Sequence, residues 1–208
     1  MICLGVSASE THSMKNTKME VDEALTRILR IAKKASSSGK KIQLSVQSSF
    51  GCGYEGPIKE EQVLRIIKEY LGAGFKNLSL ADTAGHATPD HVKRLFGKVF
   101  ELDKTLEMTG HFHNTYGMAI ANCFAAMEVG VHSLESSFAG LGGCPFTSIA
   151  GGNVSTEDLV HMLHKMDMRK DISLKPIIEV AKEAETFLKK ELPGMVYKTG
   201  GIQLVNNN

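Results

Sequence analysis

The chain has 208 residues, of which 42% are hydrophobic and 23% charged, and its formal net charge is +1 at pH 7. This length and composition are typical of one globular domain with a single buried core, and they exclude a disordered chain. Lysine and arginine form no dense cluster, so we do not expect nucleic acid as a partner. No apolar run approaches the ~20 residues that span a bilayer, so we expect no membrane association.

The four cysteines are spaced as isolated thiols rather than as pairs. Their density is too low for a secreted disulfide scaffold, and none belongs to the CxxC pair of a zinc site. Residues 1–10 also lack the basic start and long apolar core of a signal peptide. We therefore expect a cytoplasmic protein with reduced thiols.

Short apolar or β-branched segments alternate with amphipathic segments along the chain. The expected strands are residues 2–7, 41–47, 75–81, 105–113 and 131–139. Apolar residues recur at helical spacing over residues 20–36, 61–71, 89–100, 116–129, 156–166 and 174–190. Thr88 and Pro89 are typical of a helix N-cap and first helical position, so we expect one helix to begin at residue 89.

Strands and helices alternate at intervals of roughly thirty residues, which predicts parallel strands joined by right-handed helical crossovers. A doubly wound open sheet and a (β/α)8 TIM barrel both fit this pattern. Polar or reactive residues follow each expected strand, in the segments SASE, QSSFGCGYEG, ADTAG, HFHNT and AGLGGCP. We predict an α/β fold of the barrel type, because barrels gather their chemistry at the C-terminal ends of several strands. The barrel would be incomplete, since a full one needs eight strands and about 250 residues.

His111 and His113 lie two positions apart in an expected strand, so their side chains share one face. Two imidazoles on one face can bind a single cation. Asn153 follows the last strand, and its amide oxygen would complete a mixed nitrogen and oxygen site for Mg²⁺, Mn²⁺ or Zn²⁺. This donor set lacks a carboxylate ligand.

Cys144 lies in the segment AGLGGCPFTSIAGGN, residues 139–153, whose five glycines argue against a helix or a strand. No base stands at a fixed sequence distance from this thiol, so by itself it is interpreted as a small apolar residue in a turn. We interpret the remaining early histidines as surface or packing residues; they are His12, His86, His91 and His132.

Five motifs, in order and at matching spacing, resemble those of the 3-hydroxy-3-methylglutaryl-CoA lyases. They are SASETHSMKN, FGCGYEG, LADTAG, HFHNTYG and AGLGGCPFTSIAGGNVSTEDL, and the resemblance extends from residue 1 to about residue 166. The segment around Cys144 is the specific one, because the related isopropylmalate and homocitrate synthases lack that cysteine. Two departures are small: Gly53 stands where the family usually has proline, and Asn114 where it often has aspartate.

The resemblance implies a TIM-barrel lyase with a divalent cation, Mg²⁺ or Mn²⁺, held by His111, His113 and Asn153. By the family's pattern, residues 2–7 form the fourth strand, so the chain corresponds to strands four to eight and a C-terminal helix. The first three βα units would be absent, and with them an Arg-Asp pair that supplies the carboxylate ligand. We therefore expect residues 1–208 to form a single partial catalytic domain, N-terminally truncated, that is inactive alone.

The reaction that the resemblance implies is retro-Claisen cleavage of 3-hydroxy-3-methylglutaryl-CoA to acetyl-CoA and acetoacetate, as in leucine degradation and ketone-body metabolism. It implies Cys144, Asp82 and His111 as catalytic residues, and Asn16 and Glu157 near the substrate or its CoA moiety. A thiol, with an ordinary pKa of about 8.5, can return a proton to the enolate near neutral pH. Cys144 therefore suits a general acid better than a nucleophile, on a loop that closes over the substrate and excludes water.

Two alternatives stay open. The chain could act on a different 3-hydroxyacyl-CoA, or it could be a non-catalytic fragment or subunit that completes a barrel with another chain. An open sheet of this kind would leave two edges unpaired and expose an apolar barrel interior. Besides an acyl-CoA substrate, we therefore expect a second copy of the chain, as in a dimer, or a complementing N-terminal chain.

Overall fold

The computed structural model describes residues 1–146 and 151–202. Its elements, in chain order, are β1 (Ile2–Ser7), α1 (Glu10–Thr17), α2 (Val21–Ser37), β2 (Ile42–Gln47), α3 (Glu60–Gly72), β3 (Asn77–Asp82), α4 (Pro89–Leu102), β4 (Glu107–Phe112), α5 (Ala119–Glu128), β5 (Ser133–Glu135), the short 3-10 helix η1 (Phe138–Gly140), α6 (Thr156–Lys165), α7 (Leu174–Leu188) and α8 (Val196–Thr199).

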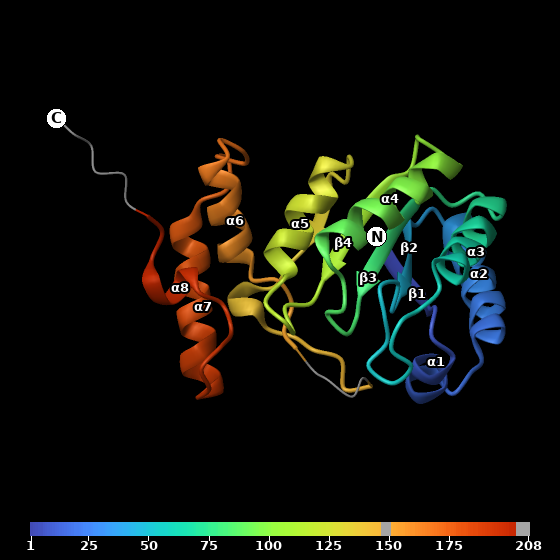
Figure 1. The fold of residues 1–208 in the computed structure, drawn as a ribbon, viewed down its shortest axis with the longest axis horizontal. Coiled ribbons are helices and arrows are strands. Elements are labelled where there is room, and N and C mark those ends of the chain that lie inside the picture. The colour runs from blue at the N-terminus through green and yellow to red at the C-terminus, as the bar shows by residue number, and fades with distance from the viewer. Residues whose placement is uncertain (147–150, 203–208) are drawn as a thin grey trace.

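The strands form one parallel sheet in the order β1-β2-β3-β4-β5, so each strand pairs with its neighbour in the sequence. Figure 1 shows the helices following one another across the molecule, from α2 and α3 beside β1 and β2 to α6 and α7 at the opposite end. A doubly wound sheet would reverse its strand order partway, which this sheet does not do. The prediction of five βα units of a barrel is confirmed.

The outer face of the sheet is apolar and packs against the helices. Leu44, Val46, Leu78 and Leu80 are fully buried there, in one cluster with residues of α3 and α4 such as Ile66 and Phe96. Helices α2 to α5 each bury apolar residues in this cluster, which explains why their segments could be recognised in the sequence.

The inner face of the sheet is polar, which corrects the expectation of an apolar barrel interior. Gln43, Ser45 and Ser79 occupy the alternate positions of β2 and β3, and the Gln43 amide donates a hydrogen bond to Thr109 Oγ1 at 3.0 Å. The reason is the period-two alternation of a strand: in IQLSVQ the apolar residues take one face and the polar residues take the other.

The first turns of α4 and α1 show how N-cap residues in the sequence set where a helix begins. Thr88 caps α4 by accepting a hydrogen bond from the His91 N–H at 3.4 Å, and Pro89 is the first helical residue, as predicted. The sequence pattern did not predict α1, whose N-cap is Ser9: its hydroxyl accepts from the His12 N–H at 3.0 Å. This cap positions α1 directly after the carboxyl end of β1.

The last strand is shorter than expected. Pairing ends at Glu135, and the chain turns into η1, where Ala139 has a left-handed φ of 53°. The loop after η1 runs toward α1 (Figure 1). Helices α7 and α8 pack near η1 around the small cluster of Ala139, Ala181, Leu192 and Tyr197. The described residues include no helix with the length and hydropathy needed to cross a membrane.

Candidate active site

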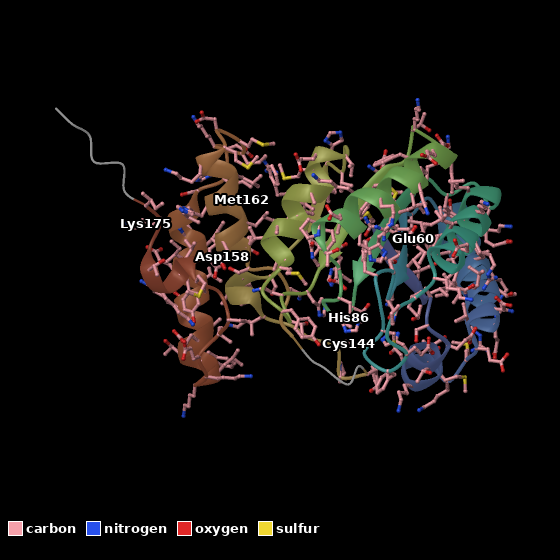
Figure 2. All side chains as sticks on the ribbon, viewed as in Figure 1. Glu60, His86, Cys144, Asp158, Met162 and Lys175 are labelled. Atoms are coloured by element: carbon pink, nitrogen blue, oxygen red, sulfur yellow. The ribbon has the colours of Figure 1, made fainter. Side chains whose placement is uncertain are left out.

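A cavity of about 370 Å³ lies on the inner face of the sheet. It brings together five of the seven residues that the sequence singled out: Asn16, His111, His113, Cys144 and Asn153. Further lining residues are Cys3, His12, Gln43, Ser45, Gln47, Ser79, Ala81, Thr83, Glu135, Gly142, Gly143 and Pro145. Cys144 reaches it from the loop after η1, on the side of the molecule that carries α1, as Figure 2 shows by comparison with Figure 1.

The two histidines share a face, as the strand pattern predicted. The Nε2 atoms of His111 and His113 lie 3.1 Å apart. His111 Nδ1 lies 2.7 Å from a carboxylate oxygen of Glu135, which stands opposite it in the register of β4 and β5. When Nδ1 donates its proton to this carboxylate, Nε2 carries a free lone pair that faces the cavity, which is the arrangement common at histidine metal ligands.

His113 is buried, and this burial, reinforced by the nearby His111, lowers its pKa to about 4. The ring is therefore neutral at pH 7. A neutral imidazole is the form that binds a metal ion.

Asn153 is held beside His113 by an antiparallel backbone bridge, with Val154 N–H donating to the Phe112 carbonyl at 3.0 Å. Its side-chain amide donates to the Leu141 carbonyl at 2.8 Å. The other atom of that amide, Oδ1, is buried and has no hydrogen-bond partner among the described residues. Two imidazole nitrogens and an unpartnered amide oxygen fit a divalent cation.

No group of three or more His, Cys, Asp or Glu side chains that could hold a metal occurs in the described part of the chain. The candidate donors that the cavity brings together are His111, His113 and Asn153.

Gly142 and Cys144 show why the loop after η1 is rich in glycine. Gly142 has a φ of 118°, which L side chains rarely adopt, and a Cβ there would collide with the Asn153 amide. The loop can therefore pass close over Asn153 and carry the half-buried Cys144 thiol into the cavity.

His12 is the main residue that the sequence interpretation missed. Its Nε2 lies 3.5 Å from Cys144 Sγ, and the ring is 1% exposed. His12, which the sequence led us to interpret as a surface or packing residue, is thus buried and also contacts a thiol that this interpretation did not anticipate. Only the fold brings two residues separated by 132 positions together.

Asp82 does not line the cavity, although its neighbours Ala81 and Thr83 do. Its side chain points to the other face of β3, where the two carboxylate oxygens accept hydrogen bonds from the His86 and Ala87 N–H groups at 2.8 and 3.1 Å. Burial raises its pKa to about 6. These contacts hold the turn after β3.

Glu157 also lies outside the cavity lining. It is buried in the first turn of α6, and its Oε2 accepts a hydrogen bond from the Ala139 N–H at 3.0 Å. Glu157 thus anchors η1, the element from which the Cys144 loop departs. The structure brings it near the loop but not into the cavity lining.

Of two further cavity residues, Glu135 had a signal in the sequence and His12 had none. Glu135 ends the last strand at the position that pairs with His111, so strand alternation alone places it on the inner face. His12 gave no such signal, because the weakly amphipathic helix α1 carries it.

Comparison with known proteins shows which protein family the chain belongs to. The HMGL-like family model matches residues 1–183. Hydroxymethylglutaryl-CoA lyase YngG of Bacillus subtilis is 34% identical over 191 residues, covering 92% of this chain and 64% of that protein. The mitochondrial hydroxymethylglutaryl-CoA lyase of Bos taurus is 37% identical over 173 residues, covering 83% of this chain and 53% of that protein.

Among solved structures, an HMG-CoA lyase from Acinetobacter baumannii, in complex with coenzyme A and 3-methylmalate, superposes with a TM-score of 0.91 at 34% identity. The match covers 98% of this chain and 67% of that one. The chain thus spans between half and two thirds of the length of these two curated relatives. From the extent of the family match and these identities, the chain belongs to the HMGL-like family.

Proposed function

We propose that the chain carries one wall of an active site that cleaves 3-hydroxy-3-methylglutaryl-CoA to acetyl-CoA and acetoacetate, a step of leucine degradation. The observation that carries the proposal is the cavity shared by His111, His113, Asn153 and Cys144 in a member of this family. A cytoplasmic location is part of the proposal and rests on the isolated, unpaired cysteines.

His111, His113 and Asn153 would hold a divalent cation, Mg²⁺ or Mn²⁺. Support comes from the facing Nε2 atoms, the lowered pKa of His113 and the unpartnered Asn153 Oδ1. When bound, such a cation polarises the tertiary hydroxyl of the substrate and lowers its pKa. Glu135 keeps the His111 ring oriented through its contact with Nδ1.

Cys144 would act as the general acid. Once a base has accepted the hydroxyl proton and the carbon-carbon bond has broken, acetoacetate is formed and the electron pair of that bond resides in the thioester enolate. The thiol proton then passes to the enolate carbon, which yields acetyl-CoA and leaves a thiolate. The glycine-rich backbone around Gly142 and Gly143 allows the thiol to approach the substrate.

An acyl-CoA substrate is supported by the Acinetobacter baumannii relative, which was solved with coenzyme A. Asn16 lines the cavity from α1 and stays the candidate for contact with the CoA moiety. For Asp82 and Glu157 the hydrogen bonds described above support positioning roles. Association with a second copy or a complementing chain also remains a prediction.

The test combines metal binding, substrate protection and turnover with the purified chain. We expect Mn²⁺ to bind, with affinity reduced at least tenfold in His111→Ala and Asn153→Ala, and 3-hydroxy-3-methylglutaryl-CoA to protect Cys144 from iodoacetamide. Acetoacetate formation that disappears in Cys144→Ala would support the reaction and contradict the expected inactivity of the chain alone. Protection by a different 3-hydroxyacyl-CoA in place of this one would redirect the proposal to that substrate. Absence of both Mn²⁺ binding and protection would overturn it.

A further inference from the structure

A histidine from the start of the chain contacts the cysteine of the glycine-rich loop. His12 Nε2 lies 3.5 Å from Cys144 Sγ, a hydrogen-bond separation when sulfur is a partner. Both side chains line the cavity, so the contact lies where a substrate would bind rather than behind it.

Packing alone does not account for a histidine at this position. The ring is 1% exposed, and its Nδ1 has no hydrogen-bond partner among the described residues. Burying an imidazole costs free energy that a phenylalanine of similar shape would avoid. Burial also lowers the pKa of His12, an effect that the nearby Glu55 carboxylate opposes, so the ring is neutral at pH 7.

His12 is held in place by a capped helix, whereas Cys144 follows two glycines. Helix α1 holds His12 through the Ser9 cap, and the Ser9 hydroxyl in turn donates to the buried Cys52 sulfur at 3.1 Å. Cys144, in contrast, follows Gly142 and Gly143, both of which have positive φ angles. The imidazole therefore defines where the thiol sits when the loop lies over the cavity.

We propose that His12 is a positioning residue that holds the Cys144 thiol and stabilises its thiolate. A neutral imidazole can accept the S–H proton at Nε2 or, as the other tautomer, donate an Nε2–H to sulfur. The bond to a thiolate is the stronger of the two because it is charge-assisted. The role after proton delivery rests on the proposed function, whereas the pair itself does not.

The charged and titratable groups around His12 include both acidic and basic side chains. Glu55 faces it from the loop after β2, Glu10 and Lys15 lie on its own helix, and His111 and Glu135 line the same cavity. None of the described cavity-lining residues is a lysine or an arginine. No permanently cationic side chain lining the cavity is therefore available to stabilise the thiolate.

The test measures iodoacetamide alkylation of each cysteine against pH, with peptide mass spectrometry and no substrate. In His12→Phe we expect Cys144 to react about tenfold more slowly at pH 8, with its pH profile displaced upward by about one unit, as loss of a charge-assisted hydrogen bond requires. His12→Gln keeps an amide nitrogen near the Nε2 position and should retain most of the rate. His12→Asn places its amide near the Nδ1 position and should resemble His12→Phe. Cys3 lines the same cavity but contacts Gln43 rather than His12, so it serves as the internal reference and should be unchanged.

Equal Cys144 profiles in wild type and His12→Phe would overturn the proposal. Equal rates in His12→Gln and His12→Asn would reduce His12 to a packing residue, and this comparison remains decisive if the phenylalanine variant fails to fold. Altered alkylation in a chain that neither binds Mn²⁺ nor is protected by acyl-CoA would keep the pair and reject only the proposed function.

Discussion

At the residue scale, Glu135 connects the edge strand β5 to the candidate metal ligand His111 of β4. Its carboxylate contacts His111 Nδ1 at 2.7 Å while remaining partly exposed. A carboxylate in this position fixes the tautomer and the orientation of the ring, so it supports a metal ligand without touching the metal.

Glu135→Gln should weaken Mn²⁺ binding about tenfold or more, because the amide keeps the shape but loses the charge. Isothermal titration calorimetry measures the affinity. Glu107→Gln is the matched control, since Glu107 begins the same strand β4 at the end away from the cavity and should leave the affinity unchanged. Equal affinities in Glu135→Gln and wild type would show that His111 needs no carboxylate partner.

Asp82→Asn should change how stability depends on pH. Burial raises the pKa of Asp82 from its ordinary 3.8 to about 6, so the folded state holds the proton more tightly than the unfolded state. This stabilising contribution is fully present below about pH 4 and is lost as pH rises through 6, a change of about 3 kcal/mol.

Urea unfolding between pH 4 and pH 7 checks this prediction for Asp82. The difference in unfolding free energy between wild type and Asp82→Asn should fall as pH rises, since all other groups titrate alike in both chains. Asp90→Asn, at an exposed aspartate in α4, is the matched control for the loss of one carboxylate. A difference for Asp82→Asn that does not change with pH would mean that burial does not raise the pKa of its carboxyl group.

At the element scale, the sequence predicted every element that buries an apolar stripe. The segment IQLSVQ alternates strictly and became β2, and Thr88-Pro89 marked the start of α4. Helix α1 escaped because ETHSMKNT has little amphipathic character and its cap, Ser9, was not recognised. The expected strand over 131–139 was too long, because Ala139 takes a left-handed conformation supported by Glu157, a contact without a local sequence signal.

Glu157→Ala should destabilise the fold by about 1–3 kcal/mol, because it leaves the buried Ala139 N–H without its acceptor. Thermal unfolding measures the loss. Glu61→Ala, an exposed glutamate in the first turn of α3, is the matched control and should have little effect. If Glu157→Ala instead kept its stability and lost only protection by acyl-CoA, the contact role implied by the family resemblance would be restored.

At the scale of the whole molecule, the contacts that the sequence did not predict are those between elements far apart in the chain. The strand order and the shared face of His111 and His113 follow from periodicity, which is local. The contact of His12 with Cys144 depends on where helix α1 and the loop after η1 lie in space. The fold also contains a second, small apolar cluster, formed by Ala139, Ala181, Leu192 and Tyr197, which is separate from the main core.

This separation predicts two units of different stability. The small cluster is tied together by Tyr197, whose hydroxyl lies 3.2 Å from the Leu192 N–H and 3.0 Å from Glu185. With few buried apolar residues, α7, α8 and η1 should open locally at a lower free energy than the sheet.

Hydrogen exchange read by mass spectrometry distinguishes the units through a pair of core truncations. Leu192→Ala should speed exchange in α7, α8 and η1 while leaving β2 and β3 unchanged, whereas Ile66→Ala should speed the slowest amides of β2 and β3. Because η1 leads into the Cys144 loop, Leu192→Ala should also loosen the contact with His12 and slow alkylation of Cys144 at pH 8. Equal acceleration of β2, β3 and α7 in Leu192→Ala would instead mean that the chain unfolds as one cooperative unit, in which the thiol loop cannot move independently of the sheet.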